Sequence, residues 1–455
     1  MGRPLEHRPQ TLYLEGHRRR HHHQSPTRPR HPPPDQNADR PLADKHEKDV
    51  IAWRHDIHQN PELSNREFRT SNLIADHLRA LKFDEVHINV APTGVVGVLR
   101  GGTPGDRVVA LRADIDALPV AETADVAFKS TRVDEDYPGG PFPVAHACGH
   151  DTHTAMLMGA ASVLAEMRDD IPGTVMFIFQ PAEEGPPLGE EFGADAMVKA
   201  GVFQNLKPGA VFGMHVAFFP VNHIGYAIGV QNGASEVITI DIEGKQTHGS
   251  MPFMGLDPLP VLAAINDGFA QIYRQIDTNT AMTISIGKID TVGRSNIIGQ
   301  RIVATGTVRA ISDAVMDDIN MRLQRVVENA ARMHGLTATL KIDQHVPAVV
   351  NQPEWLERFV PTAERVAGKD KVFKMEPTMG YDDVSVFMNA VGGGIYFILG
   401  GQHTRFDENG NLVAAEEGGP GPVPNHNPGF YADDAVLKTG VRLHAYSALD
   451  YLTGT

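Results

Sequence analysis

The stretch Thr174-Val-Met-Phe-Ile-Phe-Gln-Pro-Ala-Glu-Glu184 joins five consecutive apolar residues to a pair of carboxylates. Such an apolar run is typical of a β-strand that is buried on both faces. Helical patterns flank it at 154–167 and 194–199, and a further strand pattern follows at 210–215. This alternation of helix and strand predicts an α/β fold with a largely parallel central sheet.

Acidic and imidazole side chains follow or end three of the predicted strands, namely Asp116, the pair Glu183 and Glu184, and His215. Ligands of parallel sheets collect beyond the carboxyl ends of the strands, so we expect these side chains to share one site. An adjacent pair of carboxylates is more often a solvated loop, but this pair directly follows a buried strand. Because neighbouring residues point in different directions, one carboxylate can bind a metal ion while the other acts as general base on its water.

The stretch His146-Ala-Cys-Gly-His-Asp-Thr-His153 places the only cysteine of the chain among three histidines. In an extended segment Cys148 and His150 would point to the same side, and Gly149 would permit a close backbone approach. A thiolate and an imidazole suit zinc-like ions, but a catalytic site needs at least one further protein ligand. Two alternatives stay open here, a buried free cysteine beside solvated histidines and a cysteine–histidine nucleophile.

The 455-residue chain contains 41% hydrophobic residues and carries a formal net charge of −15. Its length predicts two or three domains. The negative charge disfavours nucleic acid and anionic membranes as partners. No apolar run reaches the roughly 18 residues that a membrane-spanning helix needs. A single cysteine excludes an internal disulfide bond.

Residues 1–41 are rich in arginine, histidine and proline and lack apolar periodicity, which predicts a disordered tail. The tail lacks the continuous apolar region of a secretory signal, so we expect a cytoplasmic protein. Order is expected to begin near Leu42.

Helix and strand patterns continue on both sides of the central stretch. Helical patterns cover 50–57, 65–81 and 432–451, and strand patterns cover 86–90, 94–99 and 107–112. After Gly233 the pattern changes, with strands at 236–242, near Met282, at 302–309 and at 337–342, and helices at 259–273 and around Ile319. This change indicates a second structural region from 233 to 346.

Five motifs occur in an order that resembles one family: Arg112-Ala-Asp-Ile-Asp-Ala-Leu-Pro119, His146-Ala-Cys-Gly-His-Asp151, Gln180-Pro-Ala-Glu-Glu-Gly185, Met214-His-Val216 and His426-Asn-Pro-Gly-Phe430. The chain resembles the M20 metallopeptidases, and within them the amidohydrolase branch of hippurate, N-acyl-amino-acid and auxin-conjugate hydrolases, over roughly 51–452. The resemblance implies a zinc-exopeptidase-like catalytic domain with a mostly parallel sheet, formed by 42–232 and 347–455. It also implies an inserted α+β lid and dimerisation domain at 233–346.

The resemblance further implies roles for single residues. Five of them would bind two divalent metal ions per subunit, with zinc, manganese or cobalt as candidates: Cys148, His150, Glu184, His215 and His426. Glu183 would be the general acid and base, and Asp116 would orient a ligating imidazole. In the lid, His248 would stabilise the oxyanion, within its own subunit or across a homodimer. Asn296 and Arg309 would hold the carboxylate of the substrate.

The implied reaction is hydrolysis of the amide bond of an N-acyl-amino acid, a small-molecule substrate, to a carboxylic acid and a free amino acid. The stretch Met379-Gly-Tyr-Asp-Asp-Val384 departs from the Gly-x-Glu-Asp-Phe pattern of the branch, so the acyl and side-chain preferences stay open. One alternative is an M20 dipeptidase or aminopeptidase. Another is a non-catalytic dimeric binding protein, which is disfavoured because every implied ligand is present.

Overall fold

The computed structural model describes residues 39–454. Helix α1 (Asp39–Gln59) begins three residues before the predicted start of order, because Leu42 and Ala43 pack against the main core and the helix extends one turn ahead of them. Residues 39–41 of the predicted tail are therefore helical, and its remainder lies outside the described residues. Among residues 39–454, none of the helices combines the length and the apolar character that a bilayer crossing requires.

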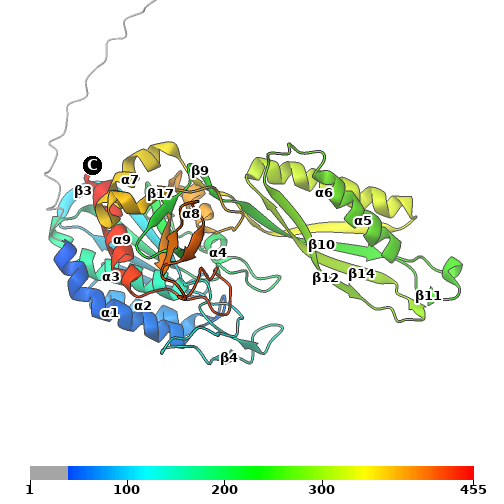
Figure 1. Cartoon of the computed structure of the whole chain (residues 1–455), viewed down its shortest axis with the longest axis horizontal. Coiled ribbons are helices and arrows are strands. Elements are labelled where there is room, and N and C mark those ends of the chain that lie inside the picture. Colours follow the sequence, from blue (N-terminus) through cyan, green and yellow to red (C-terminus); the bar gives the residue numbers. More distant parts are fainter. Residues whose placement is uncertain (1–38, 455) are drawn as a thin grey trace, which may run out of the picture.

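The main body is built on an eight-stranded sheet with the order β1-β2-β6-β3-β7-β18-β8-β17 (Figure 1). Its strands are β1 (Glu85–Val90), β2 (Gly94–Arg100), β3 (Thr103–Asp114), β6 (Pro172–Gln180), β7 (Val211–Pro220), β8 (Ile224–Tyr226), β17 (Val372–Lys374) and β18 (Gly394–Gln402). The central strands β6, β3, β7 and β18 pair in parallel, whereas β1, β2 and β6 are joined by antiparallel pairing. The predicted α/β class with a mostly parallel sheet is confirmed.

Helices cover both faces of this sheet. One face carries α1, α2 (Phe68–Ala80), α3 (His150–Glu166), α7 (Pro353–Ala367) and α9 (Ala435–Thr453), and the other carries α4 (Gly193–Lys199) and α8 (Val384–Val391). The apolar run in strand β6 is explained by its burial on both faces of the sheet. Val175, Phe177 and Phe179 join the core of the first face, while Met176 and Ile178 join that of the second. Since successive side chains of a strand point to opposite faces, both cores are filled by one continuous run.

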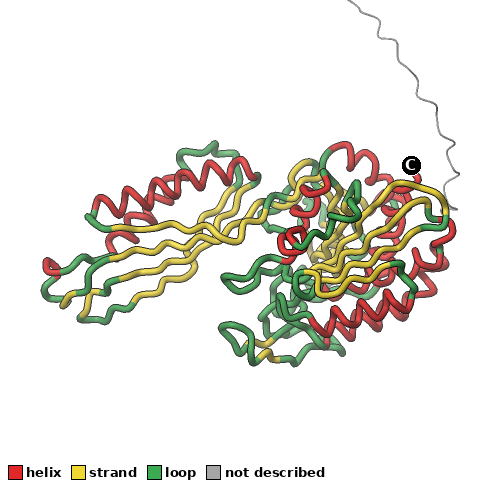
Figure 2. Tube along the Cα trace, turned by 180° about the vertical axis from the view of Figure 1, so that it is seen from behind, coloured by secondary structure: helices red, strands yellow, loops and turns green. Residues whose placement is uncertain are grey.

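A four-stranded antiparallel sheet with the order β12-β14-β10-β15 forms a second body beside the first (Figure 2). Its elements are β10 (Ala234–Glu243), α5 (Leu259–Ile272), β12 (Met282–Thr291), β14 (Arg301–Ala310), α6 (Asp313–Met333) and β15 (Thr337–Val346). Helices α5 and α6 pack on one face and share a separate hydrophobic core with the sheet. These strands lie within the predicted inserted region, 233–346, which we call the lid; its function stays a prediction.

Short elements complete the description. The ladder of β9 (Gly229–Asn232) with β16 (Val349–Asn351) stands where the chain passes between the two bodies. The remaining strands and 3-10 helices are β4 (Val133–Asp134), β5 (Phe142–Pro143), β11 (Thr247–His248), β13 (Ile297–Ile298), β19 (Thr404–Phe406), β20 (Leu412–Ala414), η1 (Arg168–Asp170), η2 (Pro252–Met254) and η3 (Lys369–Lys371).

Candidate metal centre

Cys148 and His150 stand at the start of helix α3, and the extended segment that we predicted for them is wrong. Gly149 has a φ of 91° and turns the chain into α3, whose first residue is His150. A Cβ atom on Gly149 would lie 2.4 Å from Cγ1 of Val216, so this close approach requires glycine. The two side chains converge through this turn and not through the alternation of a strand.

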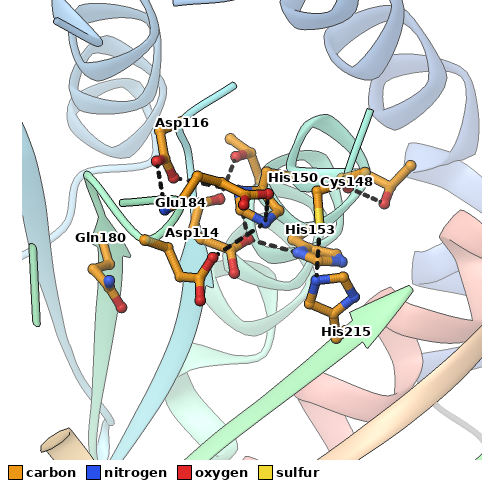
Figure 3. Close-up of polar contacts among 12 residues, drawn as sticks. Asp114, Asp116, Cys148, His150, His153, Gln180, Glu184 and His215 are labelled. Atoms are coloured by element: carbon orange, nitrogen blue, oxygen red, sulfur yellow. Dashed lines mark hydrogen bonds and ion pairs between the residues drawn. The ribbon is translucent and has the colours of Figure 1, made fainter. Parts of the chain in front are cut away.

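His215 lies within β7, and the prediction that it ends a strand is also wrong, because the apolar residues after it extend β7 to Pro220. Its Nδ1–H donates to the carbonyl oxygen of Val216 at 2.7 Å. The lone pair of Nε2 therefore faces Sγ of Cys148, 3.3 Å away (Figure 3). Burial, together with the charge of His153, lowers the pKa of His215 to about 3, so the neutral ring can bind a metal ion.

The five predicted ligands make up two groups of side chains that could each hold a metal ion, and a further group combines His150, Glu183 and Glu184. Cys148, His150 and His215 make one group, Cys148, Glu184 and His426 make another, and the atoms within each group lie within 4.8 Å of one another. Nε2 of His426 is 3.3 Å from Oε2 of Glu184, and Nε2 of His150 is 3.6 Å from Oε1 of Glu184. The five predicted ligands therefore converge, and Cys148 belongs to both groups.

Charges within the cluster oppose the effect of burial. Burial raises the pKa of Glu184, but hydrogen bonding and attraction to His426 and attraction to His150 lower it to about 2. Burial likewise lowers the pKa of His150, but Asp114, Asp116 and Glu184 raise it to about 10. Burial and the neighbouring carboxylates Glu184 and Glu183 raise the pKa of the Cys148 thiol. A cation that replaces the protons in the cluster would relieve the repulsion among these anionic groups.

Two buried atoms in the cluster, Nε2 of His150 and Oε1 of Glu184, have no hydrogen-bond partner among the described residues. Leaving a buried polar atom without a partner costs free energy. Both atoms are of the types that bind zinc-like ions, as are the cysteine sulfur and the other two imidazoles. The residues present therefore fit a centre for divalent metal ions.

Asp116 holds this cluster from behind. Its Oδ1 lies 3.3 Å from Nδ1 of His150, and its Oδ2 accepts hydrogen bonds from Oγ of Ser64 at 2.7 Å and from the backbone nitrogen of Glu184 at 3.0 Å. With Nδ1 of His150 directed at a carboxylate, Nε2 is the atom that faces Glu184. These contacts allow Asp116 to hold the His150 ring in one tautomer, and its role behind a metal ligand stays a prediction.

Glu183 lies on the other side of His150, with Oε2 at 3.9 Å from Nε2 of that ring. Burial and the charges of Asp382 and Glu184 raise the pKa of Glu183 well above its usual range. Asp382 lies close to Glu183, where Arg112 approaches it to 3.2 Å and the hydroxyl of Tyr396 donates to it. The departure from the family pattern at this position is therefore accommodated by buried partners.

The prediction from the sequence gave no role to four further residues that surround the cluster. Asp114 accepts from Nδ1 of His153 at 2.5 Å, while Nε2 of that ring accepts from the backbone nitrogen of Val216 at 2.7 Å. Glu67 accepts from the backbone nitrogen of Ala182 at 2.9 Å and so fixes the turn before Glu183. Nδ2 of Asn425 donates to the backbone oxygens of Cys148 and Val216, at 2.9 and 3.0 Å. Asp114 lies within one motif and His153 two residues after another, but Glu67 resembles an ordinary acidic residue before a helix.

The lid residues divide between its two ends. Arg309 lies at the end of β14 next to the main body, with its guanidinium carbon 4.6 Å from the ring centre of Tyr381. His248 is in β11, which Figure 1 shows at the opposite end, and the backbone oxygen of Asn296 accepts from Gly249 there, at 2.8 Å. The ten-residue strand β14 runs between these ends and is about 30 Å long. Within one chain, therefore, His248 and Asn296 lie far from both the cluster and Arg309. In a single chain, Asn296 and Arg309 thus do not form the shared carboxylate site that we predicted.

Comparisons with known proteins identify the family of the chain. Residues 110–449 match the family described as Peptidase family M20/M25/M40. The chain is 36% identical to Thermostable carboxypeptidase 2 of Saccharolobus solfataricus over 405 residues, which cover 88% of this chain and 95% of that protein. It is 32% identical to IAA-amino acid hydrolase ILR1-like 4 of Arabidopsis thaliana over 411 residues, which cover 89% and 86%.

Two solved structures share the whole fold. A putative aminohydrolase from methicillin-resistant Staphylococcus aureus is 30% identical with a TM-score of 0.76, covering 91% of this chain and 98% of that one. The YXEP protein of Bacillus subtilis, described as a dinuclear metal-binding peptidase of the M20 family, is 27% identical with a TM-score of 0.70, covering 90% and 99%. The predicted family resemblance is confirmed, and the chain belongs to the peptidase family M20/M25/M40.

Proposed function

We propose that the protein is a binuclear metal-dependent amidohydrolase that cleaves N-acyl-amino acids to a carboxylic acid and a free amino acid. The observation that carries the proposal is the pair of ligand groups that share Cys148, with Glu183 beside them and Arg309 across from them. Family membership supports a metal-dependent amidohydrolase acting on small molecules. The N-acyl-amino acid is the finer part of the proposal.

Cys148, His150, Glu184, His215 and His426 would hold the two ions. The number of ions is supported by the description of the Bacillus subtilis relative as dinuclear. When bound, such ions activate water at neutral pH and stabilise negative charge on the carbonyl oxygen. The donor set of one thiolate, three imidazoles and one carboxylate suits zinc, manganese or cobalt.

Glu183 would carry the proton. In this mechanism Oε2 of Glu183 takes the proton of the attacking water and delivers it to the nitrogen of the leaving amino acid. The pKa of Glu183 is raised above the ordinary carboxyl range, which is the direction that a general acid and base at neutral pH requires. Asp382 and Glu184 supply the charge that raises the pKa of Glu183.

Arg309 would bind the carboxylate of the amino-acid half. Burial lowers the pKa of this guanidinium, and its buried Nη1 has no hydrogen-bond partner within residues 39–454. A half-buried arginine with a buried donor that lacks a partner is suited to an anionic ligand, since a guanidinium can donate two parallel hydrogen bonds to one carboxylate.

His248 and Asn296 would act on the site of a second subunit. Both are exposed at the end of the lid that points away from the cluster of their own chain. The same end carries exposed apolar side chains, including Phe253, which is 80% exposed. A homodimer formed through the lid would cover such surface and bring His248 of the partner subunit to the substrate.

A carboxypeptidase is a second candidate, favoured by the names of two Saccharolobus solfataricus relatives that are each 36% identical to this chain. Its substrate is chemically close, because a peptide is an N-acyl-amino acid whose acyl group is itself a peptide. Arg309 would serve a peptide's terminal carboxylate in the same way.

A substrate screen tests the proposal. Protein loaded separately with zinc, manganese or cobalt is assayed with N-acetyl, N-benzoyl and indole-acyl amino acids and with N-blocked dipeptides. We expect release of free amino acid, its loss on chelation and its return with metal. Faster cleavage of the dipeptides would favour the carboxypeptidase. Inactivation by thiol alkylation of metal-loaded protein, with no effect of chelators, would instead indicate a cysteine nucleophile.

A further inference from the structure

Tyr381 connects the lid to the catalytic loop. The guanidinium carbon of Arg309 stands 4.6 Å from its ring centre. Its hydroxyl donates to the backbone oxygen of Glu183 at 3.4 Å, and its ring meets Phe192 edge-on with centroids 5.8 Å apart. One side chain therefore touches both the proposed carboxylate anchor and the backbone of the proposed proton carrier.

The stacking contact has an electrostatic consequence. The face of an aromatic ring is negative, so it attracts a guanidinium above it, and the attraction grows when water is excluded. Arg309 is half-buried and makes this contact while Nη1 has no hydrogen-bond partner among the described residues. The ring can thus hold the cation without occupying its N–H donors, which a carboxylate in the same place would do.

The contact also fixes a distance. Arg309 is on strand β14 of the lid, whereas Tyr381 and Glu183 belong to the main body. Tyr381 occupies the open position of the family pattern Gly-x-Glu-Asp-Phe, so the pattern itself does not require an aromatic ring there. Without the ring of Tyr381, the guanidinium of Arg309 would be held less firmly against the main body. Its distance from the scissile amide bond, on which Glu183 would act, would then vary more.

We propose that Tyr381 is a positioning residue that orients Arg309 toward a carboxylate adjacent to the scissile amide, and so selects α-carboxylate substrates over their neutral amides. The inference deepens the proposed function and rests on it for the role of Arg309. The aromatic ring of Tyr381 would orient Arg309, because the ring makes the contact with the guanidinium. The hydroxyl contributes only the hydrogen bond to the backbone of Glu183.

The test is a double-mutant cycle with two substrates, an N-benzoyl amino acid and its carboxamide, both followed by benzoate release. We expect Tyr381→Leu to lower the acid-to-amide ratio of kcat/KM by about 2- to 30-fold, which is the range for a cation over a ring. The loss should fall on KM of the acid. Tyr381→Phe keeps the ring and should keep the ratio. In an Arg309→Ala background Tyr381→Leu should change the ratio no further.

Other results would overturn the inference. If Tyr381→Leu slows both substrates equally, or lowers the ratio further in Arg309→Ala, the ring supports the fold and does not act through Arg309. Tyr381→Met fills the same space with an unbranched chain and replaces the leucine variant if that variant does not fold, as judged by circular dichroism and metal content.

Failure of the proposed function gives a different result. Wild-type protein that releases benzoate from neither substrate would contradict the proposed function. Calorimetry would then still measure how much more tightly the acid binds than the amide, in wild type and in the Tyr381 variants. A wild-type preference for the acid that is unchanged in Tyr381→Leu would overturn only the role of Tyr381.

Discussion

The neighbouring carboxylates Glu183 and Glu184 have pKa values that their surroundings shift in opposite directions. Glu183 is buried beside Asp382 and Glu184, and these charges raise its pKa, whereas the pairing of Glu184 with His426 lowers the pKa of Glu184 to about 2. Environments that shift the pKa values of two carboxyl groups in opposite directions are typical of sites where one group carries a proton and the other stays ionised. The pair thus supports the division into proton carrier and ligand.

Substitution of each glutamate tests this division. We expect Glu183→Gln to lower kcat by about 10²- to 10⁴-fold, the usual contribution of a general acid and base, with metal content retained. Glu184→Gln removes a proposed ligand and should lose metal. Metal analysis and steady-state kinetics on the same preparations measure both effects. Equal metal loss in the two variants would reject the assignment.

The start of helix α3 is tied to helix α1. Asp151, in the first turn of α3, accepts from Nε of Arg54 and from Nδ1 of His58, each at 2.8 Å, and Nε2 of His58 lies 2.9 Å from Glu122. Burial lowers the pKa of His58, but Asp151 and Glu122 raise it to about 9. Because α3 begins at His150, this buried ion cluster fixes the helix end that carries a proposed ligand.

The His58 contacts predict a pH dependence of stability. Since the folded-state pKa of about 9 exceeds the ordinary value of 6.5, the protonated ring stabilises the fold below pH 6.5, and this contribution is lost as the pH rises through 9. The full effect is about 3 kcal/mol. Urea unfolding between pH 6 and 10 should show a smaller decline in His58→Gln than in wild type. His87→Gln, which alters an exposed histidine, is the control. Parallel curves for wild type and His58→Gln would contradict the assignment.

The sequence predicted elements better than the turns between them. Strand β6 and helices α3 and α4 were predictable because apolar periodicity is set by burial on the sheet. The turn at Gly149 was not, because its φ of 91° follows from the approach of Val216, a contact distant in sequence. The proposed ligands were predicted through motifs, whereas Glu67 was missed because its partner Ala182 is 115 residues away.

At the scale of the whole molecule, the chain places its proposed catalytic groups on two bodies. Arg309 reaches the main body from the near end of the lid, and Nε2 of Gln344 donates to the backbone oxygen of Pro186 at 2.9 Å, two residues after Glu184. His248 and Asn296 are at the far end. The sequence could assign all three residues to the lid. It could not show that Arg309 lies at one end and His248 and Asn296 at the other, because this depends on how the strands run through the sheet.

Complementation tests whether the far end acts across a dimer. His248→Ala and Glu183→Gln chains should each be nearly inactive alone. After subunit exchange, half of the dimers carry one complete site, so about one quarter of wild-type activity should return. Sedimentation of differently tagged chains establishes exchange. No recovery despite exchange would place His248 outside catalysis.

Metal stoichiometry of wild type and Cys148→Ser tests the central claim most directly, because Cys148 belongs to both ligand groups. The protein is loaded with zinc, freed of loosely bound ions by gel filtration, and analysed for metal per chain by mass spectrometry. We predict close to two ions per wild-type chain and fewer in Cys148→Ser, with the fold of the variant retained by circular dichroism. Wild-type protein with no tightly bound metal, or a Cys148→Ser variant that keeps the full wild-type content, would contradict the binuclear centre.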